Sequence, residues 1–193
     1  MNDNRLIAVR YFDFSDNFFD LVEAVLNESI IHGNQTFGVF SSDADLEKEY
    51  RELTKWSDNR IMIPILFNFF HAIELYLKAA IYLIEIPKGK ATHKLSRYFE
   101  KFENHYPNKT KLIDTINYYI YPKKECDILF SFYELNRIEN SSEFYEVFKY
   151  PYNVKFHQPF NFKDLRNTEE SGIAFFKKIL IDIQIIRDEK KNI

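Results

Sequence analysis

A stripe of ionisable side chains marks the most apolar stretch of the chain. At about 100° per residue, its members fall within about 60° of one another on a helix; they are Arg60, His71, Glu74, Lys78 and Glu85. Glu74 and Lys78 stand four residues apart with the carboxylate first, the favourable order for a helical ion pair. Charges that are partly buried need partners. The stripe therefore predicts either a polar pocket lined by His71, Glu74 and Lys78, or a seam that stitches neighbouring helices together.

The helix that carries this stripe is predicted over residues 60–86. Nearly all of its other residues are apolar, and Pro87 followed by Gly89 ends it. Three ionisable residues in mid-segment argue against a transmembrane span, because each would cost roughly 2.5–3.5 kcal/mol in a bilayer. We expect a central core helix with no membrane partner. Residues 1–5 lack a basic-then-apolar signal pattern, so we also expect a cytoplasmic protein.

Composition favours a helical fold for the whole chain. Hydrophobic residues make up 46% and aromatic residues 18%, which is enough apolar surface to argue against disorder. Only 4 of the 193 residues are glycine, too few for the many turns of an all-β fold. We see no linker or internal repeat and expect one predominantly helical domain over residues 1–193.

Apolar spacing and cap residues predict the remaining elements. Residues 5–14 look extended or irregular, and residues 140–161 look like a structured loop with a short hairpin turning at Pro151–Asn153. Further helices are predicted over residues 16–31, ending at Gly33; 43–56, on the surface and capped by Ser42; 93–104, capped by Thr92; 109–121; 123–139; and 162–190, capped by Asn161 and Asp164.

Several kinds of site are excluded. Cys126 is the only cysteine, which excludes an intrachain disulfide and a thiolate metal cluster, and its helical surroundings favour a buried thiol. His71 and Glu74 lie one turn apart, but no further cluster completes a metal site, so we expect no metal. We expect no cofactor, because no phosphate-cradling glycine-rich loop is present. The net charge of -3 lacks the footprint of a broad nucleic-acid binder but permits a local basic patch.

Three short motifs resemble those of HEPN-like helical domains. The family's apolar-Glu-Leu-x-Leu-Lys-Ala helix is similar to the run His71-Ala72-Ile73-Glu74-Leu75-Tyr76-Leu77-Lys78-Ala79-Ala80. Its His-x-Leu opening of the next helix is similar to His93-Lys94-Leu95, and its Arg/Lys-Tyr-Pro segment to Lys149-Tyr150-Pro151. The resemblance covers residues 60–190 in order. It implies an all-α, up-and-down helical bundle that pairs into dimers, so we expect a homo-oligomer.

The resemblance also implies a set of ligand-binding residues. Glu74, Lys78, His93 and Lys149 match the motifs residue by residue, and Tyr150 joins them. The alternative is a structural role, in which Glu74 and Lys78 order the helix and His93 bridges to Glu74 across the turn. Relatives include RNA-cleaving toxins, phage-defence components, and non-catalytic modules that bind nucleotides, nucleic acid or protein partners.

The ribonucleases of the family share an Arg-x4–6-His motif, in which histidine moves a proton while arginine orients it and stabilises phosphate charge. No arginine in this chain is followed by a histidine at that spacing. The missing motif favours a non-catalytic module that binds nucleotide, RNA or a protein partner in phage defence or a toxin–antitoxin system. The alternatives are a divergent ribonuclease, using His71 or His93 with Arg97 or Arg137, and a homodimeric interaction protein.

Overall fold

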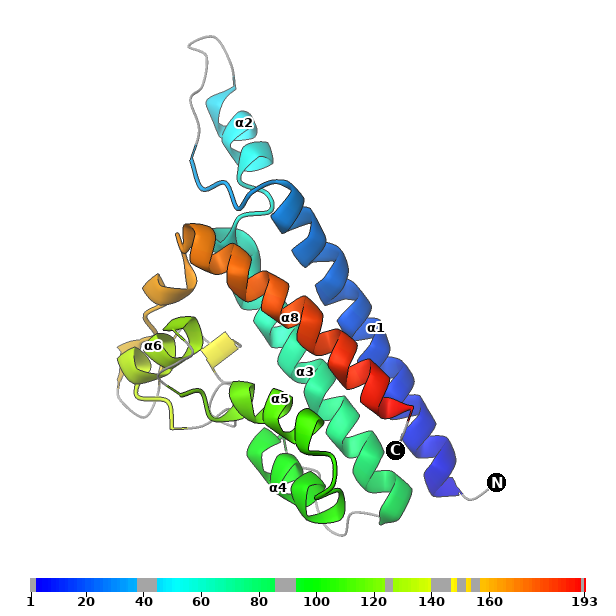
Figure 1. The fold of residues 1–193 in the computed structure, drawn as a ribbon. Helices are drawn as coiled ribbons and strands as arrows, with labels where there is room; N and C mark the ends of the chain where they lie inside the picture. The colour runs from blue at the N-terminus through cyan, green and yellow to red at the C-terminus, as the bar shows by residue number, and fades with distance from the viewer. Residues whose placement is uncertain are drawn as a thin grey trace.

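The computed structural model describes residues 3–37, 45–85, 93–123, 127–139, 147–148, 152–153, 157–191 and 193. Three long helices lie side by side and set its shape (Figure 1): α1 (Asp3–Ile31), α3 (Asp58–Ile84) and α8 (Glu169–Lys190). The predicted all-α class is confirmed. The shorter elements are α2 (Leu46–Leu53), α4 (Leu95–His105), α5 (Thr110–Ile120), α6 (Asp127–Asn136), the 3-10 helix η1 (Lys163–Leu165), and the strands β1 (Tyr152–Asn153) and β2 (Gln158–Pro159).

Helix α1 begins well before its predicted start. The prediction of an extended segment over residues 5–14 is wrong, because the helix already runs through them. Val9 and Tyr11 favour strands by propensity, but packing against α3 and α8 outweighs that preference. The helix ends at Ile31, as predicted, and Gly33 just beyond it has the positive φ of 72° that glycine permits. Its buried positions alternate four and three residues apart, which is the spacing of paired helices: Ala8, Phe12, Ser15, Phe19, Val22, Leu26 and Ser29.

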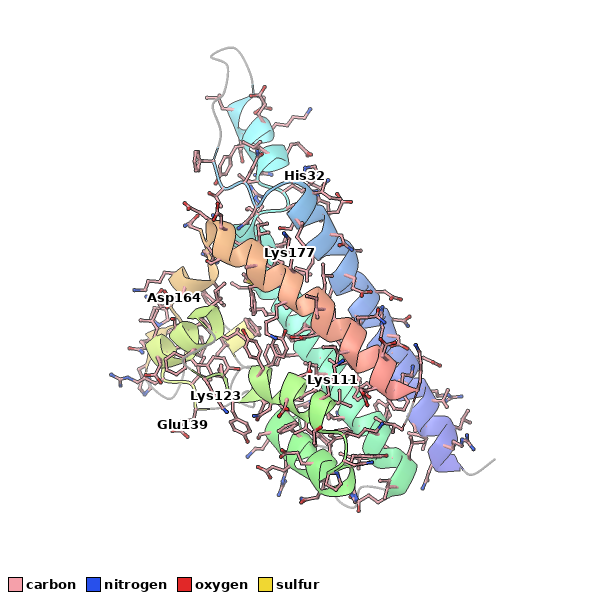
Figure 2. The ribbon with its side chains drawn as sticks, viewed as in Figure 1. His32, Lys111, Lys123, Glu139, Asp164 and Lys177 are labelled. Carbon is pink, nitrogen blue, oxygen red and sulfur yellow. The ribbon has the colours of Figure 1, made fainter. Side chains whose placement is uncertain are left out.

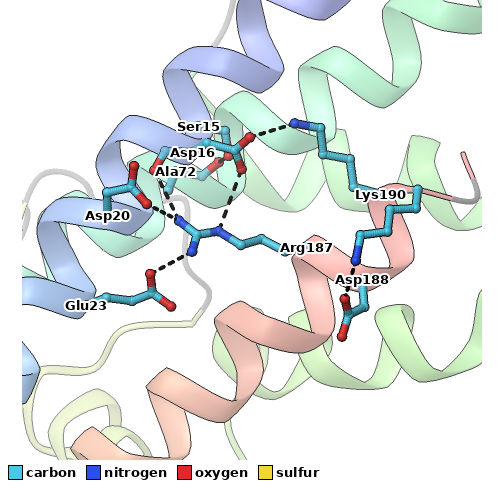
Figure 3. Close-up of polar contacts among 9 residues, drawn as sticks. Ser15, Asp16, Asp20, Glu23, Ala72, Arg187, Asp188 and Lys190 are labelled. Atoms are coloured by element: carbon cyan, nitrogen blue, oxygen red, sulfur yellow. Dashed lines mark hydrogen bonds and ion pairs between the residues drawn. The ribbon is translucent and has the colours of Figure 1, made fainter.

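Ion pairs hold α8 against α1 (Figure 3). The Arg187 guanidinium lies 2.6 Å from both Asp20 and Glu23, and the Lys190 amine lies 2.6 Å from Asp16. Burial opposes the charge on Arg187, but hydrogen bonds and charges from Asp20 and Glu23 outweigh it and raise the Arg187 pKa. The guanidinium therefore stays charged, and these ion pairs join the last turns of α8 to the middle of α1.

Helix α8 starts at Glu169, seven residues later than the predicted 162. The buried carboxylate of Asp58 fixes this start. It accepts hydrogen bonds from the Thr168 N–H at 2.6 Å and the Asn167 N–H at 3.1 Å, and also from the Asn34 amide. Asp58 thus joins the end of α1, the start of α3 and the start of α8. A Cβ at Gly172 would collide with the Thr168 hydroxyl, so this corner requires a glycine.

The cap predicted from Asn161 and Asp164 belongs to a different element. The Asn161 side chain accepts from the Lys163 N–H at 3.0 Å and starts η1, not α8. Helix α6 stops at Asn136, earlier than the predicted 139, because the Asn136 side chain accepts from the Asn161 N–H at 2.7 Å. This pair of contacts ties the α6 terminus to the segment that leads into α8.

The remaining boundaries lie close to prediction. Helix α2 is a surface helix with no buried residue, and it projects beyond the three long helices (Figure 1). Its cap is Asp45, whose side chain accepts from the Lys48 N–H at 3.3 Å. The hairpin is present, but Tyr152 and Asn153 form strand β1 and Asn153 pairs with Gln158, so the predicted turn at Pro151–Asn153 is wrong. Several residues named in the predicted helix limits lie outside the described residues, as does Cys126: they are Ser42, Pro87, Gly89 and Thr92.

Within the described part of the chain, α3 is the single helix long and apolar enough to cross a membrane. Of its most apolar window, 72% is buried inside the fold, as in the core helix of a bundle. Helix α1 covers one side of α3 and α4 covers another. The ionisable stripe of α3 therefore meets both neighbours.

Candidate functional site

The carboxylate of Glu74 is the centre of the stripe. It is completely buried, and its Oε1 accepts a hydrogen bond from the Lys78 amine at 2.5 Å. The Nδ1 of His93 lies 3.2 Å from the same oxygen, and the Nδ1 of His71 lies 3.8 Å from Oε2. The Glu74–Lys78 pair and the bridge from His93 to Glu74 are thus both present. One buried carboxylate gathers three ionisable partners.

His93 lies beside this carboxylate because α4, which begins two residues after His93, runs alongside α3 in the same direction. Its beginning lies at Glu74, and its later turns lie at the end of α3, where the Lys101 amine is 2.8 Å from Glu85. The hydrogen bond from Lys101 holds the pKa of Glu85 below its usual value. Beyond α4, the Tyr106 hydroxyl donates to the Ala80 carbonyl at 2.9 Å. Contacts at both ends of α4 therefore fix the position of His93.

Exposure separates the residues that can meet a ligand from those that cannot. The side chains of Glu74 and Lys78 are 0% and 10% exposed, whereas that of His93 is 67% exposed. An ionised carboxylate only accepts hydrogen bonds, so Nδ1 of His93 must carry the proton. The Nε2 edge of the ring is then the edge that faces away from Glu74. Glu74 and Lys78 are therefore too deeply buried to contact a ligand directly.

The start of α4 carries charges that oppose its own dipole. Its first turn contains no acidic residue, and its N-cap, Lys94, makes no capping hydrogen bond through its side chain. Lys94 and Arg97 are exposed, and His93 precedes them directly. A cation at a helix N-terminus is disfavoured by about 0.3–1 kcal/mol, whereas an anion is favoured there. The cluster of His93, Lys94 and Arg97 therefore matches a bound anion.

The other predicted residues fall in three places. His71 lies on the α1 side of Glu74, with its ring 4.7 Å from that of Phe18, and is 28% exposed. Arg137 follows α6 and lines a separate cavity. Lys149 and Tyr150 lie outside the described residues. The structure thus brings His71, Glu74, Lys78, His93 and Arg97 into one region and places Arg137 apart from them.

Two residues of this region were not predicted from the sequence. Lys94 lies within the motif that resembles His-x-Leu, and its position at a helix start was the available signal. Tyr98 is buried beside the Lys78 amine, which lies 5.1 Å from the centre of its ring. This cation–π contact helps to hold Lys78 in a dry environment. The contact joins side chains of two different helices, so no local pattern in the sequence predicts it.

No three His, Cys, Asp or Glu side chains of the described segments lie together in a way that could hold a metal ion. No protein-family model, curated protein or solved structure matches this chain.

The buried pair gives a stability prediction. Lys78→Met leaves the Glu74 carboxylate buried without its main counter-charge, so we expect the free energy of unfolding in urea to fall by about 3–5 kcal/mol. The double variant Glu74→Gln/Lys78→Met removes both charges and should recover most of that loss. A single variant within about 0.5 kcal/mol of the wild type, the range of ordinary surface changes, would contradict this account.

Proposed function

We propose that this chain is an HEPN-like, non-catalytic module that binds RNA or a nucleotide through a phosphate at the start of α4. The observation that carries the proposal is the cluster of His93, Lys94 and Arg97 at a helix N-terminus with no acid in its first turn. The buried Glu74 carboxylate orients the imidazole of this cluster. The resemblance to HEPN-like domains supports a setting in phage defence or a toxin–antitoxin system.

Phosphate suits this cluster better than other anions do. It offers several acceptor oxygens, which can meet the Nε2 side of His93, the fork of Arg97 and the backbone N–H groups of the first helical turn together. Lys94 adds a further positive charge at the same helix start. Because the whole chain has a net charge of -3, binding must rest on this local patch and should fall as salt rises.

A second function, ribonuclease activity, is favoured by one contact. The 3.2 Å approach of His93 to Glu74 is the arrangement that orients a general acid or base. The shared oxygen weakens this hypothesis, because Lys78 lies 2.5 Å from the same Oε1 and already neutralises the carboxylate. A neutralised carboxylate gives less support to an imidazolium, so binding without cleavage is the better account.

Charge reversal tests the binding proposal. Arg97→Glu should weaken binding of a short single-stranded RNA at least about tenfold and reduce the slope of log K against log salt by about 0.7, as expected for one lost phosphate contact. Fluorescence anisotropy at several salt concentrations measures both. Arg10→Glu is the matched control, since it makes the same charge change at an exposed position on α1. Equal losses from both variants, or none from Arg97→Glu, would refute the proposal.

The same preparations decide between binding and cleavage. Incubation with total RNA should leave it intact. If the wild type cleaves RNA and His93→Ala does not, the protein is a divergent ribonuclease and not a binding module. The variant His71→Ala would then show whether the second histidine takes part in cleavage.

We also propose that the protein acts as a homodimer that pairs through α1. Ile7, Phe14 and Leu21 stand seven residues apart and are all exposed, Phe14 by 59%. A seven-residue apolar repeat is the pattern by which helices of two chains pair. Light scattering should therefore report a dimer that Phe14→Glu converts to a monomer. Asn27→Glu is the control, because Asn27 is an exposed residue of α1 that lies about 140° around the helix from Phe14. A monomeric wild type at micromolar concentration would exclude this interface.

A further inference from the structure

The face of α1 that points away from the bundle carries a regular row of residues, which we call the outer face of α1. They are spaced alternately three and four positions apart, and every one of them reaches solvent: Ile7, Arg10, Phe14, Asn17, Leu21, Ala24, Glu28 and Ile31. Helices α3 and α8 both contact α1 on its other side, where Phe12 and Phe19 are buried (Figure 1). A row with this spacing is the seam by which two helices pair as a coiled coil.

Opposite charges stand near the two ends of the outer face. Arg10 is exposed, and no side chain of the described segments forms an ion pair with it. The Glu28 side chain is 47% exposed and lies 3.5 Å from His32, which leaves its second oxygen for another donor. Figure 2 shows His32 at this end of α1, away from the corner that carries Lys123 and Glu139. Because Arg10 and Glu28 are about 27 Å apart along the helix, they cannot meet within one chain.

These charges decide how a second copy of α1 fits on the outer face. In a parallel, in-register pair, Arg10 would face Arg10 of the second copy and Glu28 would face Glu28, and like charges across an interface oppose association. In an antiparallel pair, Arg10 of each copy faces Glu28 of the other, and the two-fold axis forms this ion pair twice. A second copy therefore complements the charges when it runs in the opposite direction.

The sizes of the side chains agree with the same antiparallel register. With Arg10 opposite Glu28, the alternating spacing sets the other facing pairs: Ile7 with Ile31, Phe14 with Ala24, and Asn17 with Leu21. The largest side chain of the face thus meets the smallest, which lets the two helices approach closely. The most exposed apolar residue of the face, Ile31 at 74%, is covered by another isoleucine. Asn17 lies beside the two-fold axis, where a polar residue in a helix seam fixes the register.

We infer that two copies of this chain pair through the outer faces of α1 in antiparallel orientation, with Arg10 of each copy opposite Glu28 of the other. The inference rests on the proposed homodimer and specifies its direction and register. Both ion pairs lie near the ends of the seam and in contact with water, so the dimer weakens as the salt concentration rises.

Charge reversal tests this orientation. Analytical ultracentrifugation of the full chain measures the dissociation constant of the dimer. Arg10→Glu and Glu28→Arg should each raise this constant at least about tenfold, because each variant places like charges opposite one another at two positions. The double variant Arg10→Glu/Glu28→Arg restores both ion pairs and should return to within about threefold of the wild type. A parallel dimer has like charges opposite one another in the wild type and in all three variants, so it would show neither the losses nor the recovery.

Arg5→Glu is the matched control. It makes the same charge change on the same helix, at an exposed position about 140° around the helix from Arg10, and should leave the dissociation constant unchanged. A wild-type dimer that both single variants leave intact, or a double variant that stays as weak as the single ones, overturns the antiparallel register and keeps the homodimer. A monomeric wild type overturns both. The phosphate site is judged separately, because Arg97→Glu reports on RNA affinity and not on dimerisation.

Discussion

The site depends on one buried charge. Taking a carboxylate out of water costs several kcal/mol unless close partners compensate, and Glu74 is completely buried on the most apolar helix of the chain. Lys78 supplies the counter-charge from the same helix, and Tyr98 covers it from α4. His93 completes the set from the residue pair that leads into α4. The contact with His93 therefore places the start of α4 beside this carboxylate, and the exposed Lys94 and Arg97 lie at that start.

A second buried carboxylate on the same helix shows what a purely structural role looks like. Asp58 accepts hydrogen bonds from backbone N–H groups, the Thr168 hydroxyl and the Asn34 amide, and none of these donors titrates. It joins helix ends and presents nothing to solvent. Glu74 accepts from an amine and an imidazole, and the imidazole is largely exposed. Helix α3 thus carries one carboxylate that joins helix ends at its start and one, near its middle, that contacts a largely exposed imidazole.

Features set by local periodicity could be predicted from the sequence. The run of apolar residues in α3 predicted both ends of this helix to within two residues. The 3.6-residue period of a helix predicted that Glu74, Lys78 and His71 lie together. The contact of His93 with Glu74 followed from the resemblance of two short motifs. Its role as a ligand remains a proposal. The site residues Lys149 and Tyr150 belong to a segment that the described structure does not reach.

Features set by contacts distant in sequence could not be predicted. The start of α8 depends on Asp58, more than a hundred residues earlier in the chain, so the apolar pattern of α8 alone placed it too early. The first turns of α1 contain strand-forming residues and are helical only because α3 and α8 cover them. The cavity beside Arg137 combines the ends of α5 and α6. One of its residues, Tyr121, forms a side-chain hydrogen bond with Ser96 of α4, and no motif connects the two.

The central claim is that Glu74 holds His93 so that its outer nitrogen meets a phosphate. The chain has 5 histidines, and NMR can follow each imidazole during a titration with inorganic phosphate. His32 is the internal control, because it also pairs with a glutamate, Glu28 at 3.5 Å, but lies at the end of α1. The account predicts that the His93 resonances shift and saturate while those of His32 stay in place. An unmoved His93, or a His32 that shifts equally, would contradict it.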